Sequence, residues 1–546
     1  MRFRWKFCLL ITALLGGLAH WSSGPVHTQA LSCLVTTANG AVQGRDNGTS
    51  CAFLGVPFAV PPVGALRWRP PQPAAPWTPA TLNATVPPSN CSLVNPPGSA
   101  TTLGSEDCLR MIIWTPDPMP AAAPVIVWFH PGAFVAASAN LAAQNGRRMA
   151  ERTGAIVVAT NYRLGPFGFL AHAALTAEDP SYASSGNYGL LDQRAALVWV
   201  RDNINAFGGD PNNVTIAGTS AGGHSVSFHM VAPGSSGYFH RAIMQSGYAS
   251  SRWPTLAEGE ALGATLAAAL GCTSPADVLT CLRSKSRTEL LLALPTGQQQ
   301  WAETSRAEWG PLVDGLEIPD QPRTLYEDGR FAQVPVVIGA TRDEGWIYAD
   351  RSFPAELSAE QYEAAVQTEF GPGDAPAILA RYPAADYRSP KHALSQIAGD
   401  FEAVCEARRV ARLVARKQPD VYVYSFEREI AAVGGDQVIH GMETNFVFGN
   451  NYGPPTQYVL SADDLGLSDA VMDFWVRFAT TGNPNPVRRG GDHGPDVWPE
   501  YNSGSSRYIV LDSPIRDDKR LRQDACDLWD TFFFRSLAGT LPASAR

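Results

Sequence analysis

The sequence has neither the clustered ligands of a metal centre nor the linker segments that separate domains in a multidomain chain. It contains no C-x-x-C or H-x-x-x-H pattern, so we expect no metal and no cofactor. Ser/Gly linkers, low-complexity blocks, charge runs and internal repeats are also missing. The length of 546 residues would by itself suggest roughly two to four domains, but nothing marks a boundary between them. We therefore predict a single domain over residues 31–546.

A surplus of positive charge is absent too. The net charge of -9 argues against nucleic acid or an anionic membrane surface as a partner. Beyond the first thirty residues no apolar run is long enough to span a bilayer, so no stable membrane anchor is expected. Hydrophobic residues make up 45% of the chain, which is enough for a sizeable core. A small molecule is the expected partner, and the oligomeric state stays open.

The first thirty residues have the layout of a secretion signal. Three positive charges come first, at Arg2, Arg4 and Lys6. An apolar run over 7–18 and a stretch of small and polar residues follow. We predict a secreted, extracellular protein whose signal ends somewhere between residues 19 and 30, with three possible cleavage sites after Ala19, Gly24 or Ala30.

Cysteine usage agrees with an oxidising compartment. Of nine cysteines, Cys8 lies in the signal, which leaves an even set for disulfides: Cys33, Cys51, Cys91, Cys108, Cys272, Cys281, Cys405 and Cys526. Pairing nearest neighbours would close three short loops and leave 405 with 526 to tie the C-terminal segment to the body, although sequence alone leaves the pairing open. Four sequons are candidates for glycosylation: Asn47, Asn83, Asn90 and Asn213.

Short apolar, β-branched runs recur along the chain, with helix-like segments between several of them. They lie at 125–129, 156–160, 214–217, 336–338 and 421–424. This pattern predicts an α/β fold built on a large, mostly parallel central sheet flanked by helices. One helix, over 190–207, leads directly into the run at 214–217. A second is predicted from a capping serine, Ser468, to Thr481, as a packing helix without chemistry.

The pentapeptide 218–222 reads G-T-S-A-G and lies between the run at 214–217 and a helix-compatible segment, 224–230. A serine on a sharp strand-to-helix turn has its hydroxyl lifted clear of the sheet, and small neighbours allow that turn. Ser220 is therefore a candidate nucleophile.

A serine hydroxyl needs a hydrogen-bonded base, and that base needs a carboxylate to orient it. On this kind of turn the order along the chain is serine, acid, histidine. Three histidines follow Ser220 too closely to approach it across the sheet: His224, His229 and His240. His392, His440 and His493 remain. We favour His440, because it follows the run at 421–424 and is flanked by Gly441. The alternative for His440 is a loop histidine in solvent.

For the acid, Asp343 and Glu344 both follow the run at 336–338, at the end of a strand where sites of open α/β sheets gather. Only one of them can face the histidine, and the residues alone do not choose between them. The turn 130–134, after another strand, could supply backbone N–H groups to an oxyanion. Gly132 and Ala133 would donate two and Ala221 a third. The alternative is an ordinary turn, shaped by its own histidine at 130.

In combination these motifs resemble the type-B carboxylesterase/lipase family of the α/β-hydrolase fold, which also contains the cholinesterases. The matching segments cover nearly the whole mature chain: FLGVPFA (53–59), SEDCL (105–109), NYRLG (161–165), GNYGLLDQ (186–193), AFGGDP (206–211), GTSAG (218–222), DEG (343–345), HG (440–441) and TGNP (481–484). The resemblance implies Glu344 as the acid and His440 as the base. It also implies disulfides 91–108 and 272–281, and 405–526 as a cholinesterase-type closure.

Three departures from the family pattern carry information. Thr219 replaces the usual glutamate before the serine and so removes a negative charge. The loop between Cys91 and Cys108 has no aromatic residue, whereas in cholinesterases it carries the tryptophan that stacks on the quaternary ammonium. Pro131 stands in the usual H-G-G turn and has no N–H to give.

We therefore expect a secreted serine carboxylesterase that hydrolyses small carboxylic esters through a Ser-His-Glu triad and an acyl-enzyme. Acetylcholine is not the expected substrate. The alternatives are a triacylglycerol lipase, against which the short and weakly apolar stretch 92–107 argues, and a non-catalytic recognition ectodomain, which typically lacks triad residues.

Overall fold

A computed structural model describes residues 33–537 except 97, 295–308, 454–456 and 487–497. The predicted signal over 1–30, with its cleavage sites, and the candidate His493 lie outside the described residues. Within them, no helix is long and apolar enough to cross a membrane.

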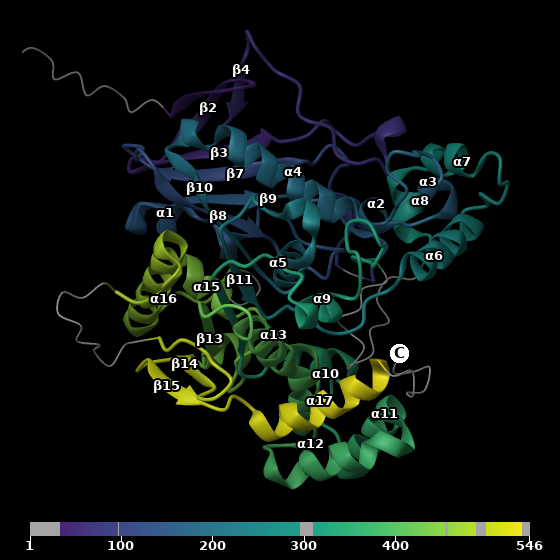
Figure 1. Cartoon of the computed structure of the whole chain (residues 1–546), viewed down its shortest axis with the longest axis vertical. Coiled ribbons are helices and arrows are strands. Elements are labelled where there is room, and N and C mark those ends of the chain that lie inside the picture. The colour runs from purple at the N-terminus through teal and green to yellow at the C-terminus, as the bar shows by residue number, and fades with distance from the viewer. Residues whose placement is uncertain (1–32, 97, 295–308, 454–456, 487–497, 538–546) are drawn as a thin grey trace, which may run out of the picture.

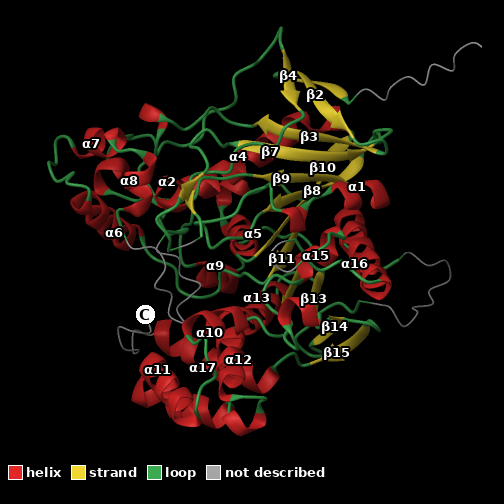
Figure 2. Ribbon diagram, turned by 180° about the vertical axis from the view of Figure 1, so that it is seen from behind, coloured by secondary structure: helices red, strands yellow, loops and turns green. Residues whose placement is uncertain are grey.

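The architecture is a large mixed sheet with helices on both faces (Figures 1 and 2). The sheet has thirteen strands, and β4 (Thr81–Ala84) pairs only with β2. The other strands, in spatial order, are β1 (Leu34–Thr37), β2 (Gly40–Asp46), β3 (Ser50–Pro57), β7 (Arg110–Pro116), β9 (Ile156–Thr160), β8 (Ala123–Phe129), β10 (Gly209–Thr219), β11 (Arg241–Gln245), β12 (Val336–Thr341), β13 (Val421–Phe426), β14 (Arg507–Leu511) and β15 (Arg516–Lys519).

In this order, neighbouring strands are parallel from β9 through β14 and antiparallel at both ends, while β4 pairs with β2 in parallel. The predicted fold class, α/β with a mostly parallel central sheet, is confirmed. Each of the five predicted runs lies in a strand of the parallel part. The antiparallel strands, β11 and β14 were not predicted, although β7 and β14 each contain a run of four apolar residues.

Successive residues of a central strand pack into different cores. In β8, Val125, Val127 and Phe129 belong to one apolar cluster, whereas Ile126 and Trp128 belong to the cluster on the opposite face. A strand buried on both faces needs apolar side chains at every position. This need explains why the sequence shows continuous apolar runs and not an alternating pattern.

Helices of the first face contribute to the larger cluster: α2 (Gly165–Phe169), α4 (Tyr188–Asn203), α5 (Ala221–Val231), α6 (Leu256–Ala269), α7 (Val278–Ser284), α8 (Arg287–Leu292), α9 (Pro322–Asp328) and α13 (Cys405–Ala415). On the opposite face lie α1 (Arg147–Thr153), α15 (Glu443–Phe448) and α16 (Ala462–Thr481). The short helices α3 (Ala173–Thr176) and α14 (Ala431–Gly434) and the hairpin of β5 (Leu93–Val94) and β6 (Thr102–Leu103) lie in connections.

A third cluster lies at one end of the molecule, seen at the bottom of Figure 1. There α10 (Trp346–Ser352), α11 (Ala359–Arg381), α12 (Pro390–Gly399) and α17 (Gln523–Leu537) gather, and α11 is interrupted at Gly371. The structure contains the disulfides 33–51, 91–108, 272–281 and 405–526. The last joins the start of α13 to α17 across 121 residues and so ties the C-terminal helix to the body.

The predicted helix from Ser468 is wrong at its start. Helix α16 begins at Ala462, after Ser461, whose hydroxyl accepts a hydrogen bond from the backbone N–H of Asp464 at 3.1 Å. The Asp464 carboxylate in turn accepts from the backbone N–H of Ser461. This reciprocal capping box outweighs the isolated serine signal. Ser468 lies buried inside the helix and donates to the Phe446 carbonyl.

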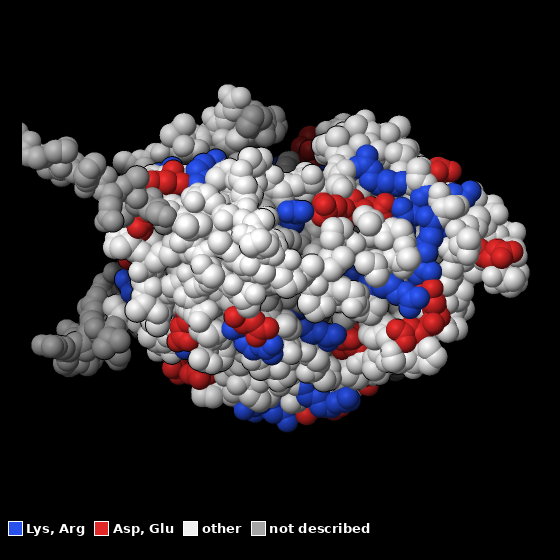
Figure 3. Space-filling model, turned by 90° about the horizontal axis from the view of Figure 1, so that it is seen from above, with Lys and Arg blue, Asp and Glu red and all other residues white. Residues whose placement is uncertain are grey.

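The asparagine side chains of the four sequons differ in their exposure to solvent. Asn83 is exposed, whereas Asn47, Asn90 and Asn213 are partly buried. Asn213 accepts a hydrogen bond from Arg241, and Asn90 accepts one from Asn140 at 2.9 Å. Asn83 is thus the most accessible glycosylation candidate. Elsewhere on the surface, basic and acidic side chains lie side by side on the face shown in Figure 3, with wide uncharged areas between them.

Candidate active site

Ser220 stands between β10 and α5 in a strained backbone conformation. Its φ of 58° and ψ of -124° are unusual for a residue with a side chain. The turn is close packed. A Cβ on Gly222 would lie 2.0 Å from the Phe129 carbonyl oxygen, so no larger residue fits there. The strained residue stands where β10 ends and α5 begins, which is the strand-to-helix turn that the pentapeptide predicts.

Of the two candidate acids, Glu344 is the one that contacts His440. The His440 Nδ1–H donates a short hydrogen bond to Glu344 Oε2. The other carboxylate oxygen, Oε1, accepts from the Ser246 hydroxyl and from the Thr341 backbone N–H, each at 2.6 Å. Glu344 is buried, and the His440 side chain is 12% exposed. The carboxylate is thereby held with one oxygen aimed at the imidazole.

Asp343 turns the other way and holds the loop that carries His440. Its carboxylate accepts from the Val438 backbone N–H at 2.8 Å, from Arg342 at 2.9 Å and from Gln396 at 2.7 Å. The Asp343 backbone N–H donates to the Val438 carbonyl at 3.0 Å. Asp343 is therefore a buried positioning residue that binds the backbone of Val438, two residues before the histidine.

His440 presents its second ring nitrogen, Nε2, without a hydrogen-bond partner among the residues that the structure describes. The segment after it lies against the nucleophile turn: a Cβ on Gly441 would be 3.7 Å from Thr219 Cγ2, and the hydroxyls of Thr219 and Thr444 are 3.2 Å apart. The structure thus brings Glu344 and His440 into contact beside Ser220 but places no hydrogen bond from Ser220 to Nε2. Such bonds often form only when substrate is bound.

Electrostatics favour an ionised Glu344 beside a basic His440. Burial acts to raise the pKa of Glu344, but the charge and hydrogen bond of His440 outweigh it, so the pKa lies below its usual value. For His440, burial acts to lower the pKa, and the Glu344 charge raises it above 6.5 on balance. Each group therefore favours the charged form of the other.

The turn after β8 has a left-handed backbone at three successive residues. Gly132, Ala133 and Phe134 have φ values of 116°, 50° and 61°. Within the described residues, neither the Gly132 nor the Ala133 N–H donates to another group. The Ala221 N–H, at the first position of α5, has no partner inside its own helix. His130 shapes the turn, stacked on Tyr162 with ring centroids 4.2 Å apart.

Other candidate histidines have structural partners. His229 lies between Ser235 at 2.8 Å and Gln193 at 3.0 Å, and His240 accepts from the Val214 backbone N–H. His392 lies on α12, 3.6 Å from the Asp343 carboxylate, and so supports the acid that does not contact His440. The serine, the histidine and the chosen acid are the residues that the structure gathers.

The fold agrees with comparisons to known proteins. The model of the Carboxylesterase family matches residues 32–529. An acetylcholinesterase of Bungarus fasciatus is 32% identical to this chain over 550 residues, which cover 93% of this chain and 87% of that protein. The chain belongs to the carboxylesterase family. It is a carboxylic ester hydrolase, and small-molecule esters are the substrates that this family indicates.

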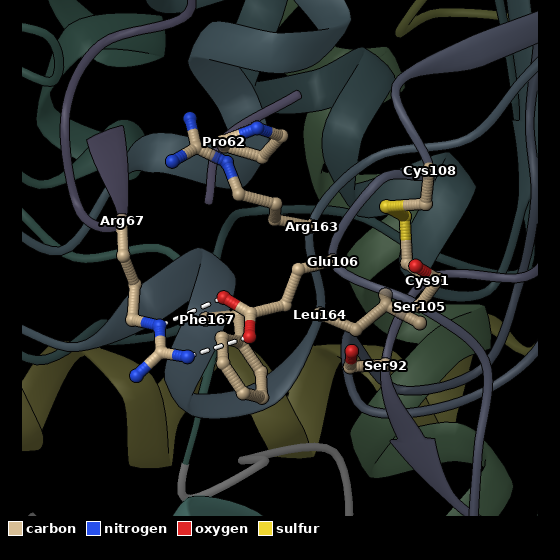
Figure 4. A pocket seen from close by; sticks show the side chains of 10 residues that line it. All are labelled: Pro62, Arg67, Cys91, Ser92, Ser105, Glu106, Cys108, Arg163, Leu164 and Phe167. Atoms are coloured by element: carbon tan, nitrogen blue, oxygen red, sulfur yellow. Dashed lines mark hydrogen bonds and ion pairs between the residues drawn. A yellow bond between two sulfur atoms is a disulfide. The ribbon is translucent and has the colours of Figure 1, made fainter. Parts of the chain in front are cut away.

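In this carboxylesterase, two cavities are lined by residues away from the serine and histidine. The smaller, of about 10 Å³, has room for a single water. Figure 4 shows that it is enclosed by the Cys91–Cys108 disulfide and the ion pair of Arg67 and Glu106, 2.6 Å apart. The larger cavity, of about 180 Å³, is lined by Thr341, Arg342 and Arg522 among others. The first belongs to the packing of the disulfide loop, and the second borders the segment before Glu344.

Sequence reasoning missed a second buried acid next to this site. Glu443 Oε1 accepts from the Ser246 hydroxyl at 3.2 Å and from Gln245 at 3.3 Å. Ser246 thus lies between Glu443 and Glu344. Burial, reinforced by the Glu344 charge, raises the pKa of Glu443 to about 7. The only signal in the chain was a carboxylate three residues after His440, which has no meaning until the loop is folded.

Glu443→Gln should remove a pH-dependent loss of stability. Between pH 4.5 and about 7, the folded protein keeps Glu443 protonated while the unfolded chain ionises it, so the unfolded state binds fewer protons and stability falls as pH rises. Relative to Glu443→Gln, wild type should therefore lose up to about 3 kcal/mol across that window. Calorimetric midpoints at several pH values measure the difference, with the exposed Glu356→Gln as control. Parallel curves for wild type and Glu443→Gln would contradict the assignment.

Proposed function

We propose that this chain is a secreted serine carboxylesterase that acts through Ser220, His440 and Glu344. Ser220 Oγ attacks the ester carbonyl carbon while His440 Nε2 takes its proton. The N–H groups of Gly132, Ala133 and Ala221 stabilise the oxyanion. The alcohol leaves with a proton from His440, and an acyl-enzyme on Ser220 remains.

Water completes the turnover by the same route. His440 takes a proton from the water, whose oxygen attacks the acyl carbon, and the same backbone donors hold the second oxyanion. Collapse of this intermediate returns the proton to Ser220 Oγ and releases the carboxylic acid. Glu344 stays ionised throughout, because its role is to orient the imidazole and stabilise the imidazolium.

The observation that carries the proposal is the buried Glu344–His440 pair. It leaves Nε2 of His440 unpartnered in the described structure, beside the strained serine turn. An isolated loop histidine in solvent would have no reason for a buried carboxylate held by Ser246 and Thr341. A recognition ectodomain would not need these residues together either.

The disulfides of the structure support secretion independently of the signal segment. Four disulfides form only where thiols are oxidised, and the closing one spans 121 residues. The exposed sequon at Asn83 suits a glycoprotein of the same compartment.

Ser220→Ala should abolish turnover of a short-chain aryl ester, with kcat lowered by about 10⁶-fold as for other nucleophilic serines. The measurement is initial rate with p-nitrophenyl butyrate, together with labelling by a fluorescent phosphonate that reacts with activated serines. The exposed Ser236→Ala is the matched control and should keep both rate and label. Substantial turnover by Ser220→Ala would refute the nucleophile.

The acid limb of kcat/KM should have its midpoint above pH 6.5. The base must be neutral, and the Glu344 charge raises the pKa of His440 above that value. Glu344→Gln should move the midpoint to lower pH and cut kcat by about 10⁴-fold.

Asp343→Asn makes the same charge change one residue away and should leave the midpoint in place, because Asp343 does not contact the imidazole. The comparison requires pH–rate profiles from about pH 5 to 9 for all three proteins. A midpoint that does not respond to Glu344→Gln would contradict its role as the acid.

Choline esters should receive no special preference, although the relative from Bungarus fasciatus is named an acetylcholinesterase. The loop from Cys91 to Cys108 offers no ring to a quaternary ammonium, and Thr219 puts no charge before Ser220. Acetylcholine and its neutral isostere 3,3-dimethylbutyl acetate should therefore have kcat/KM values within about threefold. A cation–π site worth about 2 kcal/mol would instead favour acetylcholine about 30-fold, and that result would overturn this expectation.

A further inference from the structure

The larger of the two cavities, of about 180 Å³, lies at the carboxyl ends of β12 and β13. Ala340 and Ser425 are register partners near these strand ends, and both line the cavity. Ligand sites of open α/β sheets gather at such strand ends. Thr341 lines the cavity too, and its backbone N–H donates to Glu344 Oε1 at 2.6 Å. Within the described residues, this is a cavity apart from the serine and histidine that shares one segment with the acid.

Arg522 reaches the cavity from the segment between β15 and α17, in an unusual backbone conformation. Its φ is 46°, and that of Arg520 is 62°. A left-handed backbone is unfavourable for a residue with a Cβ, and such strain collects at functional sites. Between the two arginines, Leu521 lines the cavity as well. The strained segment thus gives the cavity one cationic and one apolar residue.

The Arg522 guanidinium has long contacts for a charged group. Nη2 donates to the Arg342 carbonyl at 3.3 Å, and Nε lies 3.7 Å from Asp400 Oδ1. Charge-assisted hydrogen bonds between arginine and a carboxylate are normally about 2.7–2.9 Å long. The side chain is 31% exposed, and within the described structure no hydrogen bond from Nη1 is found. Arg522 therefore keeps donors for an anion.

The other charged residues of the lining have closer ionic partners. Glu427 accepts from the Ser425 hydroxyl at 3.1 Å and from Arg516 at 3.0 Å. The Arg342 guanidinium lies 2.9 Å from the Asp343 carboxylate. The guanidinium before α17 is thus the charged group of the lining whose ionic partner is most distant.

An apolar surface lies in the same cavity as this cation. Val404, at the end of the π-helical turn Asp400–Val404, lines it together with Leu521, and both residues are buried. A cavity of roughly 150 Å³ in another protein takes up benzene, which has six non-hydrogen atoms. A four-carbon carboxylate has the same number of non-hydrogen atoms, so it fits the 180 Å³ available here.

We propose that this cavity binds a short-chain carboxylate, with the anionic group on Arg522 and the alkyl chain against Val404 and Leu521. A guanidinium pairs with a carboxylate through two parallel N–H bonds. A bare anion such as phosphate would leave the apolar surface uncovered. Hydrolysis of a short-chain ester releases a carboxylate of this size. Only the statement that the ligand is the enzyme's own product rests on the proposed function, and the binding itself does not.

The charge and the alkyl chain are tested on wild type with butyrate as the probe. A saturation-transfer NMR titration should give a Kd on the order of 1 mM. Butyramide has the same shape without the charge, and as a competitor it should bind at least about tenfold more weakly. Butylammonium should not compete, and inorganic phosphate should bind more weakly than butyrate. Butyramide, butylammonium or phosphate that binds as tightly as butyrate would overturn the proposal.

Two variants locate the bound butyrate. Arg522→Gln should weaken binding at least about tenfold, whereas the exposed Arg416→Gln should not change it. Ala340→Leu keeps every charge and adds three carbon atoms to the cavity wall, so it too should weaken binding. The exposed Ala364→Leu is its matched control. Unchanged affinity in either folded variant would overturn the site.

Arg522 also faces the buried Asp400, so Arg522→Gln is checked for folding by its thermal transition. If neither variant folds, wild-type crystals soaked in butyrate decide the question. Density for butyrate between Arg522 and Val404 would support the proposal, and density only elsewhere would overturn it.

Failure of the proposed function would look different. Ser220→Ala should bind butyrate in this cavity as wild type does, because Ser220 does not line it. If wild type does not hydrolyse p-nitrophenyl butyrate but binds butyrate through Arg522, the serine esterase proposal fails and the carboxylate site stands. If hydrolysis depends on Ser220 but butyrate binding does not depend on Arg522 or Ala340, only the carboxylate site is overturned.

Discussion

The hydrogen bond between Glu344 and His440 depends on burial, and much of the surrounding structure keeps it buried and aligned. An ion pair in water is worth little, whereas a buried carboxylate without partners is costly. Here the Glu344 carboxylate has three donors, from His440, Ser246 and Thr341. Those donors come from three separate strand ends or loops, so the pair exists only when β11, β12 and the loop after β13 are assembled.

Two adjacent carboxylates after β12 have different roles: Asp343 positions the histidine loop, and Glu344 contacts the imidazole. A backbone bridge pairs Asp343 with Ile439, immediately before the histidine, and the Asp343 side chain holds Val438. Because neighbouring residues in an extended segment point in opposite directions, one carboxylate fixes the histidine loop while the next faces the imidazole. The strand end thus sets both the place of His440 and the direction of its ring.

The sequence allowed the sheet, the nucleophile turn and the histidine to be predicted, because each leaves a local pattern. The parallel strands are continuous apolar runs, and the turn is marked by small residues around Ser220. The choice of Glu344 over Asp343 came from family resemblance, since side-chain direction at a strand end depends on the partner loop. Ser246 and Glu443 were missed because their role exists only through contacts between segments about 200 residues apart. The start of α16 was wrong because two serines compete as caps and only Ser461 has its carboxylate partner.

The charges in the site determine the protonation states of its two buried acids, Glu344 and Glu443. Glu344 is held ionised by His440. Glu443 retains its proton more readily than a free glutamate, first because it is buried and second because a negative charge beside Glu344 is unfavourable. Thr219 adds no charge to this group of acids, and its hydroxyl lies 3.2 Å from that of Thr444.

His440 and His224, the two histidines near Ser220, have pKa values shifted in opposite directions. His440 contacts the Glu344 carboxylate, whose charge raises the pKa of the imidazole, whereas burial lowers the pKa of His224 to about 4. Near neutral pH the first can take up or release a proton, whereas the second stays neutral. Burial acts in the same direction on both rings, so it is the ionised Glu344 that makes one of them a base.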